Sequence, residues 1–463
     1  MKVMLQFVRG RFAFLLADHR LPLVVIVVTA LALRLYYIAT AQDAIAIRAD
    51  AAQYFQIALN VLNYGTFSTD GSGTGAPLPD SYRGPGYPGL LVLLLAVTGR
   101  NIEWAYLGVL TLQALLGALA AGMTYTLCRK WMPSAHAFAA GLLVACWPHL
   151  ITQAGYALTE SVFGFCIVAG VFTLSKAIDS KRLTLFAVAG ATMAYAILVN
   201  QMWFFFPFLI LFGFRARQYR FGLVLFVVTA LIPPALWEIR DAMIQAPPAR
   251  TASQRLVENV LIGMEPDFAP EYRDPKSPAK EWVARINQLY YSDRSAAYAA
   301  IAARIQNEPM RYFLWFLQKP LRLWDWSIGQ GAGDIYIYQM ASSPFERNVI
   351  YRTIAAVCRG LNVPLMLAAF AFLLVSLARR LREASRMPGT EEALFLCVFS
   401  YACAVYTVLA PDARYANPFR PFELALGAAF LCGAVGKLLA RLEHERLRKR
   451  ETGADSIVVK DVT

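Results

Sequence analysis

The stretch from Arg48 to Pro88 reads RADAAQYFQIALNVLNYGTFSTDGSGTGAPLPDSYRGPGYP. It is polar, aromatic and rich in turns, and it lies between two long apolar runs. Asp50 opens it on a segment that favours a helix, and Arg83 precedes glycines and prolines that fix the backbone before the apolar chain resumes. A loop that presents one carboxylate and one arginine between membrane segments is a candidate site for chemistry.

The composition predicts a membrane protein, because 58% of the 463 residues are hydrophobic. Apolar runs of about 18 or more residues recur, and each can cross a hydrocarbon core of roughly 30 Å as a helix. We therefore expect an all-α integral membrane protein with about ten transmembrane helices, interfacial helices and an extracytoplasmic helical region. The predicted spans are 21–40, 104–127, 137–151, 161–174, 183–199, 202–214, 221–237, 349–378, 393–410 and 419–439.

The formal charge of +13 is arranged in a way that argues against nucleic-acid binding. Lysine and arginine cluster at the ends of apolar runs in alternate loops, which is the pattern of cytoplasmic loops. The basic start (Lys2, Arg9, Arg11) and the basic tail 441–463 are predicted to be cytoplasmic, with an uncleaved first helix. We expect a multi-pass protein of a bacterial inner (plasma) membrane whose site faces the periplasm or exterior.

Four regions follow from this topology. They are an N-terminal transmembrane core at 1–240 with a first extracytoplasmic loop at 41–88, an extracytoplasmic helical region at 241–347, C-terminal transmembrane helices at 348–440, and a basic tail at 441–463. Gly89–Thr98 is apolar but short, which favours an interfacial helix. Within the helical region, Ser292-Asp293 can cap a helix that runs to about Asn307, and Pro309 starts an aromatic-rich helix.

Cysteine and histidine give no sign of a metal centre. The seven cysteines are scattered singly in or beside apolar runs, and the four histidines show no ligand spacing. No cofactor is required by these patterns.

Four groups of short motifs follow one another along the chain in an informative order. They are Asp50-Ala-Ala-Gln-Tyr54 with Arg83-Gly-Pro-Gly-Tyr-Pro88, then Thr159-Glu160, then Trp237-Glu-Ile-Arg240 followed by Asn307–Tyr312 and Lys319, and finally Arg414-Tyr415-Ala-Asn-Pro418-Phe-Arg-Pro421. Each is a weak signal alone, and their joint order is fairly specific. Together the chain resembles the GT-C superfamily of polytopic glycosyltransferases, in the branch of protein O-mannosyltransferases and lipid A aminoarabinose transferases.

The resemblance implies a glycosyltransferase that uses a polyprenyl-phosphate-linked sugar at the outer face of the membrane and inverts the anomeric carbon. The partners implied are this donor, membrane lipid, and an acceptor hydroxyl on a glycan, lipid or protein. Asp50 matches the position of the general base, but Ala51 stands where the family usually has a second acid. That departure leaves a divalent metal as an open question. No soluble sugar-nucleotide domain and no DxD motif are evident, which fits a lipid-linked donor.

Each candidate residue has an ordinary structural alternative. Asp50 is the candidate base, because an acceptor hydroxyl must lose a proton as it attacks. Its structural alternative is a helix cap. Glu160 is the second catalytic candidate, which could orient the acceptor or hold a metal. Its structural alternative is an acid that stabilises the first turn of its helix. The cations proposed to bind the donor phosphate, with snorkelling to headgroups as their alternative, are Arg83, Arg240, Lys319, Arg322 and Arg414. The candidate substrate-binding residues, with an interfacial aromatic belt as their alternative, are Tyr54, Tyr82, Tyr87 and Tyr415.

A transporter or flippase of a lipid-linked sugar is the alternative function. Its expected mark is acids or broken helices near the middle of the membrane. The charges of this sequence are predicted to lie at span ends instead, which favours the enzyme.

Overall fold

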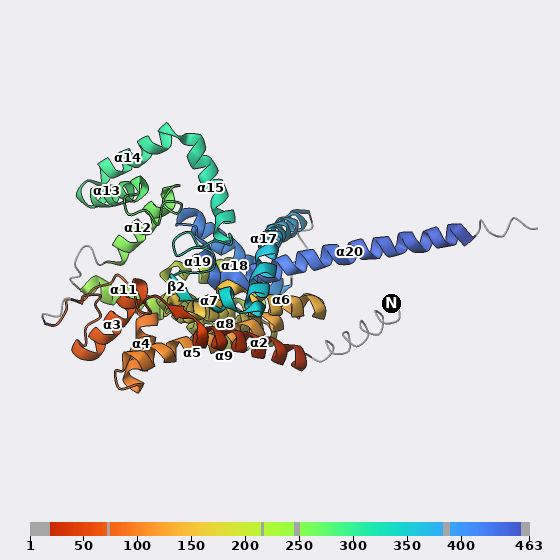
Figure 1. The fold of residues 1–463 in the computed structure, drawn as a ribbon, viewed down its shortest axis with the longest axis horizontal. Helices are drawn as coiled ribbons and strands as arrows, with labels where there is room; N and C mark the ends of the chain where they lie inside the picture. The colour runs from red at the N-terminus through yellow and green to blue at the C-terminus, as the bar shows by residue number, and fades with distance from the viewer. Residues whose placement is uncertain (1–18, 72–74, 214–216, 245–250, 383–388, 455–463) are drawn as a thin grey trace, which may run out of the picture.

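The computed structural model describes residues 19–71, 75–213, 217–244, 251–382 and 389–454. This part of the chain is almost entirely helical, and long apolar helices form a bundle from which a smaller lobe rises (Figure 1). The predicted Lys2, Arg9 and Arg11 lie outside the described residues, as do the side chains of the tail beyond Arg441.

Seven helices of the described chain are long and apolar enough to cross a membrane. They are α2 (Arg20–Thr40), α5 (Ile102–Cys128), α8 (Thr159–Ser180), α11 (Arg220–Met243), α17 (Val349–Arg382), α18 (Thr390–Val408) and the stretch Ala413–Gly436, which joins α19 (Ala413–Ala416) and a 3₁₀ turn (Asn417–Phe419) to the start of α20 (Arg420–Ala454). A helix pairs most of its backbone groups within itself, which suits a lipid environment. The chain is therefore a multi-pass integral membrane protein of the all-α class, as predicted.

The remaining three predicted spans differ from simple crossings. The predicted span 137–151 is a bent pair, α6 (Ser134–Cys146) and α7 (Pro148–Thr152) with a 3₁₀ turn (Gln153–Gly155), and the two parts meet at 50°. Pro148 at the bend has no N–H to continue the first helix. The other two are shorter, α9 (Leu183–Val199) and a 3₁₀ turn (Gln201–Trp203) followed by α10 (Phe206–Gly213). The estimate of ten thus becomes seven, or eight with the bent pair.

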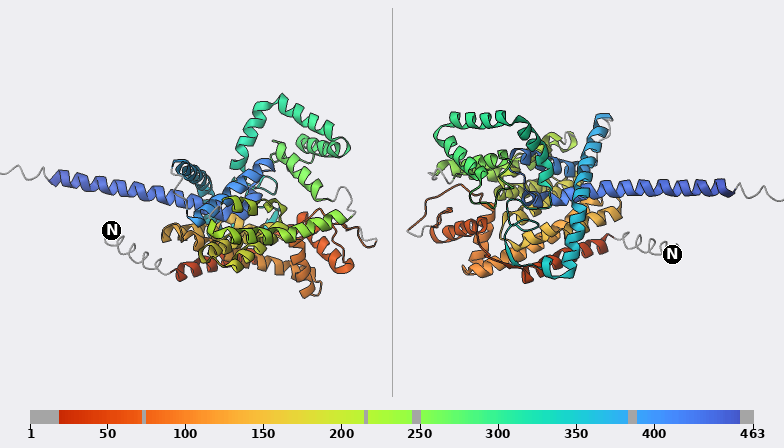
Figure 2. Two further views of the ribbon diagram at one scale, coloured as in Figure 1. Left: turned by 180° about the vertical axis from the view of Figure 1, so that it is seen from behind. Right: turned by 45° about the horizontal axis from the view of Figure 1, so that its top comes forward.

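The long helices pack around one shared apolar core. Helix α5 packs against α2, α6 and α8, and α9 lies between α8 and α11, which begins after a 3₁₀ turn (Arg217–Tyr219). Helix α17 runs along α20, whose far end extends beyond the bundle (Figure 2). The short helix α4 (Gly86–Val97) occupies the predicted interfacial segment and packs on α3 (Asp50–Tyr64).

The lobe consists of α12 (Ala252–Met264), α13 (Pro278–Ser292), α14 (Arg294–Asn307) and α15 (Pro309–Leu323). Asp293 caps α14 by accepting a hydrogen bond from the Ala296 backbone N–H, as predicted. The lobe has its own small apolar core around Trp282 and Ile286. It returns to the bundle through β2 (Met340–Ser342), which pairs antiparallel with β1 (Gln42–Asp43), and through α16 (Pro344–Arg347).

Candidate active site

Asp50 is the first residue of α3, and both of its carboxylate oxygens face an arginine. Oδ1 accepts from Nη2 of Arg83 at 2.6 Å, and Oδ2 accepts from Nη2 of Arg414 at 2.9 Å. The N-cap residue of α3 is Ala49 and Asp50 lies in the first turn, so the helix-cap alternative is wrong. The preceding residue, Ala49, has φ 48°, a left-handed value that an alanine rarely adopts, and the surrounding contacts must hold it there.

Arg83 is held from several sides. Its guanidinium donates to the Gln53 side chain at 2.6 and 2.9 Å and lies over the rings of Tyr54 and Tyr82. The turn that carries it passes so close to the end of α9 that a Cβ at Gly86 would lie 2.7 Å from the backbone nitrogen of Val199. Gly86 therefore allows the turn that carries Arg83 to pack closely against the end of α9.

Arg414 joins two carboxylates from distant parts of the chain. Its Nε donates to Oε1 of Glu160 at 2.5 Å, while its Nη2 reaches Asp50. Glu160 lies in the first turn of α8, so its helix-terminus alternative also holds. Asp412 accepts from the backbone N–H of Arg414 at 2.9 Å and caps the short helix α19. The result is a chain of alternating charges, Arg83, Asp50, Arg414 and Glu160.

The electrostatics of this chain keep Asp50 ionised. Burial alone would raise the pKa of Asp50, but the charges of Arg414 and Arg83 outweigh burial and hold that pKa well below its ordinary value. Two cations and two carboxylates balance one another. An incoming anion would therefore compete with Asp50 for the same two arginines.

The four candidate tyrosines surround this cluster at different depths. Tyr54 and Tyr82 flank Arg83, and the Tyr87 ring meets the Tyr54 ring edge-on at 5.1 Å. Tyr87 is fully buried and donates to Gln113 at 3.0 Å, which makes it part of the packing. Tyr415 lies beside Arg414 and donates to the Gln330 side chain at 3.3 Å.

Three of the five predicted phosphate-binding cations lie elsewhere. Arg240 at the end of α11 donates to the Asp80 carbonyl and to Asp241, each at 2.7 Å. Lys319 on α15 donates to the carbonyl of Val408 at 3.2 Å and lies over the Phe316 ring. Arg322 is exposed and lies over the Trp315 ring. None of them contacts Asp50 or Glu160 among the interactions of the described residues, and their role as phosphate ligands stays a prediction.

Two contributors escaped the sequence reasoning. Gln53 follows Asp50 by three residues, so it lies on the same face of α3, and helical spacing could have indicated it. Asp412, two residues before Arg414, has the position of a helix cap, which is a recognisable signal. Neither signal shows which arginine meets which acid.

The residues present do not fit a metal ion. Among the described residues, no group of three or more histidine, cysteine, aspartate or glutamate side chains is placed to hold one. The guanidinium of Arg414 bonds to both Asp50 and Glu160 and stands between these two carboxylates. No step of the reaction below is assigned to a metal.

With this geometry in view, comparison with solved structures places the fold. An oligosaccharyltransferase of Archaeoglobus fulgidus, tethered with an acceptor peptide containing the NVT sequon, aligns at 16% identity over 91% of this chain and 50% of that one, with a TM-score of 0.50. AglB of the same organism, in complex with an inhibitory peptide and a dolichol-phosphate, aligns at 15% identity over 96% and 52%, with a TM-score of 0.46. ArnT of Cupriavidus metallidurans, bound to undecaprenyl phosphate, aligns at 15% identity over 88% and 76%, with a TM-score of 0.37.

The chain thus has the fold of the polytopic GT-C glycosyltransferases, and the resemblance drawn from the sequence is confirmed at this level. Residues 75–220 match the family model described as the N-terminal part of oligosaccharyl transferase STT3. No curated protein matches the sequence. The chain spans about half the length of the archaeal oligosaccharyltransferases.

Proposed function

We propose that the protein is an inverting glycosyltransferase that moves a sugar from a polyprenyl-phosphate donor to an acceptor hydroxyl, with Asp50 as general base. The observation that carries the proposal is the carboxylate of Asp50 held between Arg83 and Arg414. The GT-C fold, and the undecaprenyl phosphate and dolichol-phosphate bound by two proteins of similar fold, support a donor of this class.

The chemistry follows from where charge develops. The acceptor oxygen attacks the anomeric carbon from the side opposite the phosphate, the bond from this carbon to the phosphate oxygen breaks, and Asp50 accepts the hydroxyl proton. The departing polyprenyl phosphate carries concentrated negative charge, which Arg83 and Arg414 are suited to bind through paired N–H donors. Glu160 orients Arg414 through the 2.5 Å bond.

The low pKa of Asp50 gives the donor a second role. A carboxylate held by two arginines is a weak base, because general bases act best with a pKa near the working pH. When the donor phosphate binds these arginines, it weakens their hold on Asp50 and raises the pKa of that carboxyl group. The base is thus strengthened only when a donor is present.

With the bent pair α6–α7 counted as one crossing, the described chain has eight spans, and we assign the site to the extracytoplasmic side of a bacterial inner membrane with both termini cytoplasmic. The basis is the distribution of lysine and arginine between loops. The site is formed by the loop after α2 and by the ends of α8 and α18 that this topology places outside.

The test uses the purified full chain with a panel of polyprenyl-phosphate sugars and candidate acceptors, measuring release of free polyprenyl phosphate. Asp50→Asn is expected to lower the rate by roughly 10²–10⁴-fold while the protein still folds. Glu281→Gln removes an exposed acid from the first turn of α13 and serves as the matched control. Turnover by Asp50→Asn close to wild type would contradict the role of base.

One feature favours the transporter alternative enough to test it beside the enzyme. The helix pair α6–α7 is broken, and Arg420 and Glu423 are fully buried within the last candidate span. The Arg420 guanidinium, however, bonds to Asn362 and to the Asp325 carbonyl, which is a structural role. Movement of a fluorescent lipid-linked sugar across vesicles that contain the protein, with no released polyprenyl phosphate, would favour transport.

A further inference from the structure

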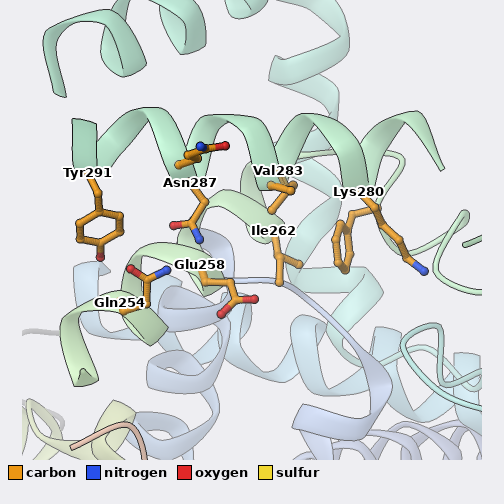
Figure 3. A pocket seen from close by; sticks show the side chains of 10 residues that line it. Gln254, Glu258, Ile262, Lys280, Val283, Asn287 and Tyr291 are labelled. Atoms are coloured by element: carbon orange, nitrogen blue, oxygen red, sulfur yellow. The ribbon is translucent and has the colours of Figure 1, made fainter. Parts of the chain in front are cut away.

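A cavity of about 410 Å³ lies between α12 and α13 of the lobe (Figure 3). Its volume falls within the range of ligand pockets, roughly 300–1,000 Å³. The apolar lining includes Ile262 of α12 and Val283 of α13, which lie on opposite sides of the gap, together with Phe268. The walls carry polar groups from both helices, which Figure 3 shows facing one another across the gap.

Three of the six polar residues that line the cavity are neutral amides, and Lys280 adds a cation. Gln254, Asn287 and Gln288 each offer both donors and an acceptor, and Glu258 and Tyr291 add a carboxylate and a hydroxyl. The Asn287 Oδ1 atom is buried and has no hydrogen-bond partner among the described residues. A buried acceptor without a partner is costly, so it indicates a missing donor.

The cavity is tied to the candidate active site through Tyr82. The Tyr82 hydroxyl donates to Oε2 of Glu258 at 3.2 Å, and the guanidinium of Arg83 lies over the same ring at 5.3 Å. Because Arg83 bonds directly to Asp50, two side chains separate the cavity wall from the proposed base.

The same helix is also anchored on the side of Arg414. Gly263 of α12 approaches the backbone after α18 so closely that a Cβ there would lie 2.5 Å from the Leu409 carbonyl carbon. The Trp315 indole N–H fixes this end by donating to the Gly263 carbonyl at 2.9 Å. Helix α12, which lines the cavity, therefore contacts both the loop that carries Arg83 and the segment that leads to Arg414.

We propose that this cavity binds a saccharide, as the part of the acceptor that lies away from the hydroxyl reacting at Asp50. Sugar hydroxyls both donate and accept hydrogen bonds, as the amide side chains of the lining do. The apolar side chains of the lining suit the C–H face of a sugar ring. A hydroxyl donor supplied to Asn287 Oδ1 satisfies a buried acceptor that has no partner among the described residues. The inference rests on the proposed function, since it specifies the chemical class of the acceptor.

The test measures binding of the full chain in detergent to a printed array of oligosaccharides built from hexoses, N-acetylhexosamines and uronic acids, with peptides beside them. Wild type is expected to bind saccharides, and Asn287→Leu is expected to bind them about tenfold or more weakly. Arg285→Ala, an exposed change on α13 outside the cavity, is the control. If Asn287→Leu does not fold, Gln254→Leu replaces it, with the same expectation.

Three results would overturn the inference: no saccharide binding by wild type, equal binding by the cavity variants, or binding to peptides alone. The measurement needs neither donor nor turnover, so it separates the two proposals. Asn287-dependent saccharide binding without any release of polyprenyl phosphate would support the cavity and contradict the transferase. Donor turnover without saccharide binding would do the reverse.

Discussion

The five cations predicted to bind phosphate divide into two groups that the structure treats differently. Arg83 and Arg414 are balanced by carboxylates that come from other helices. Lys319 and Arg322 on α15 meet carbonyls and aromatic rings instead, and Arg240 on α11 anchors the first loop. Arg240 also pairs with a carboxylate, but that carboxylate belongs to Asp241, its neighbour in the sequence. A cation paired with a carboxylate from a distant helix can exchange that partner for a phosphate, whereas one held by carbonyls, rings or a sequence neighbour contributes to packing. The partner, rather than the charge, distinguishes the groups.

Among the five cations, loss of Arg414 gives the largest expected effect on turnover, because Asp50 and Glu160 both lose the cation that they share. Arg414→Ala is expected to lower the rate of polyprenyl phosphate release by roughly 10²–10³-fold. Breaking such a largely buried pair costs about 3–5 kcal/mol of stability, so thermal unfolding in detergent is measured alongside. Arg414→Lys keeps the charge and serves as the control for it. An active Arg414→Ala protein would erase the distinction between the two groups.

A smaller loss of turnover is expected for a substitution of Gly86, which lies in the turn that positions Arg83. Gly86→Ala places a methyl group against Val199 and Leu198, which costs about 1–3 kcal/mol by overpacking. Displacement of Arg83 is expected to reduce turnover by roughly 10–100-fold. Gly89→Ala in the same helix α4 meets nothing within 4 Å and is the matched control. Equal behaviour of the two variants in rate and melting temperature would show that the turn does not position Arg83.

Lys319 should influence stability rather than turnover. Burial lowers the pKa of Lys319 to about 7, below its ordinary 10.5. Between these values the unfolded chain holds a proton that the folded chain lacks, so stability rises as the pH increases from about 7 toward 10. Lys319→Met is expected to remove this slope and to keep donor turnover near wild type. Melting temperatures of both proteins across that range test the slope, and a raised donor requirement in the variant would return Lys319 to the phosphate-binding group.

Arg322 is expected to matter least. Its side chain is exposed and lies over the Trp315 ring. Arg322→Ala should change stability by no more than about 0.5 kcal/mol and donor kinetics by no more than about twofold. A marked rise in the donor concentration needed for half-maximal rate would place a phosphate contact on α15.

The sequence was sufficient for the fold class, because apolar runs of spanning length have few alternatives in a membrane. It was less reliable where a run contains a break. Trp147-Pro148 bends one predicted span, and the proline was a signal that could have shown this. The two spans around Asn200 were assigned from composition, although α9 has only 17 residues. The prediction that every basic cluster lies on one side stays a prediction.

For the site, the sequence indicated the local pair and missed the distant one. Asp50 and Arg83 share one loop, and the structure joins them. Arg414 was selected as a cation fixed by its turn, but its contacts with Asp50 and Glu160 depend on how α8 and α19 pack. No local pattern encodes that packing, so the same reasoning placed Arg240, Lys319 and Arg322 in the same group.

The bond between Arg414 and Asp50 closes a loop of 364 residues, and this has a consequence for biogenesis. Closing so long a loop is slow and entropically unfavourable, so this contact forms late. Membrane insertion from the N-terminus delivers Asp50 and Glu160 well before Arg414, the cation that joins them. The site therefore cannot assemble until the stretch Ala413–Gly436 has been inserted, and a chain arrested before that point carries its acids without the ability to use them.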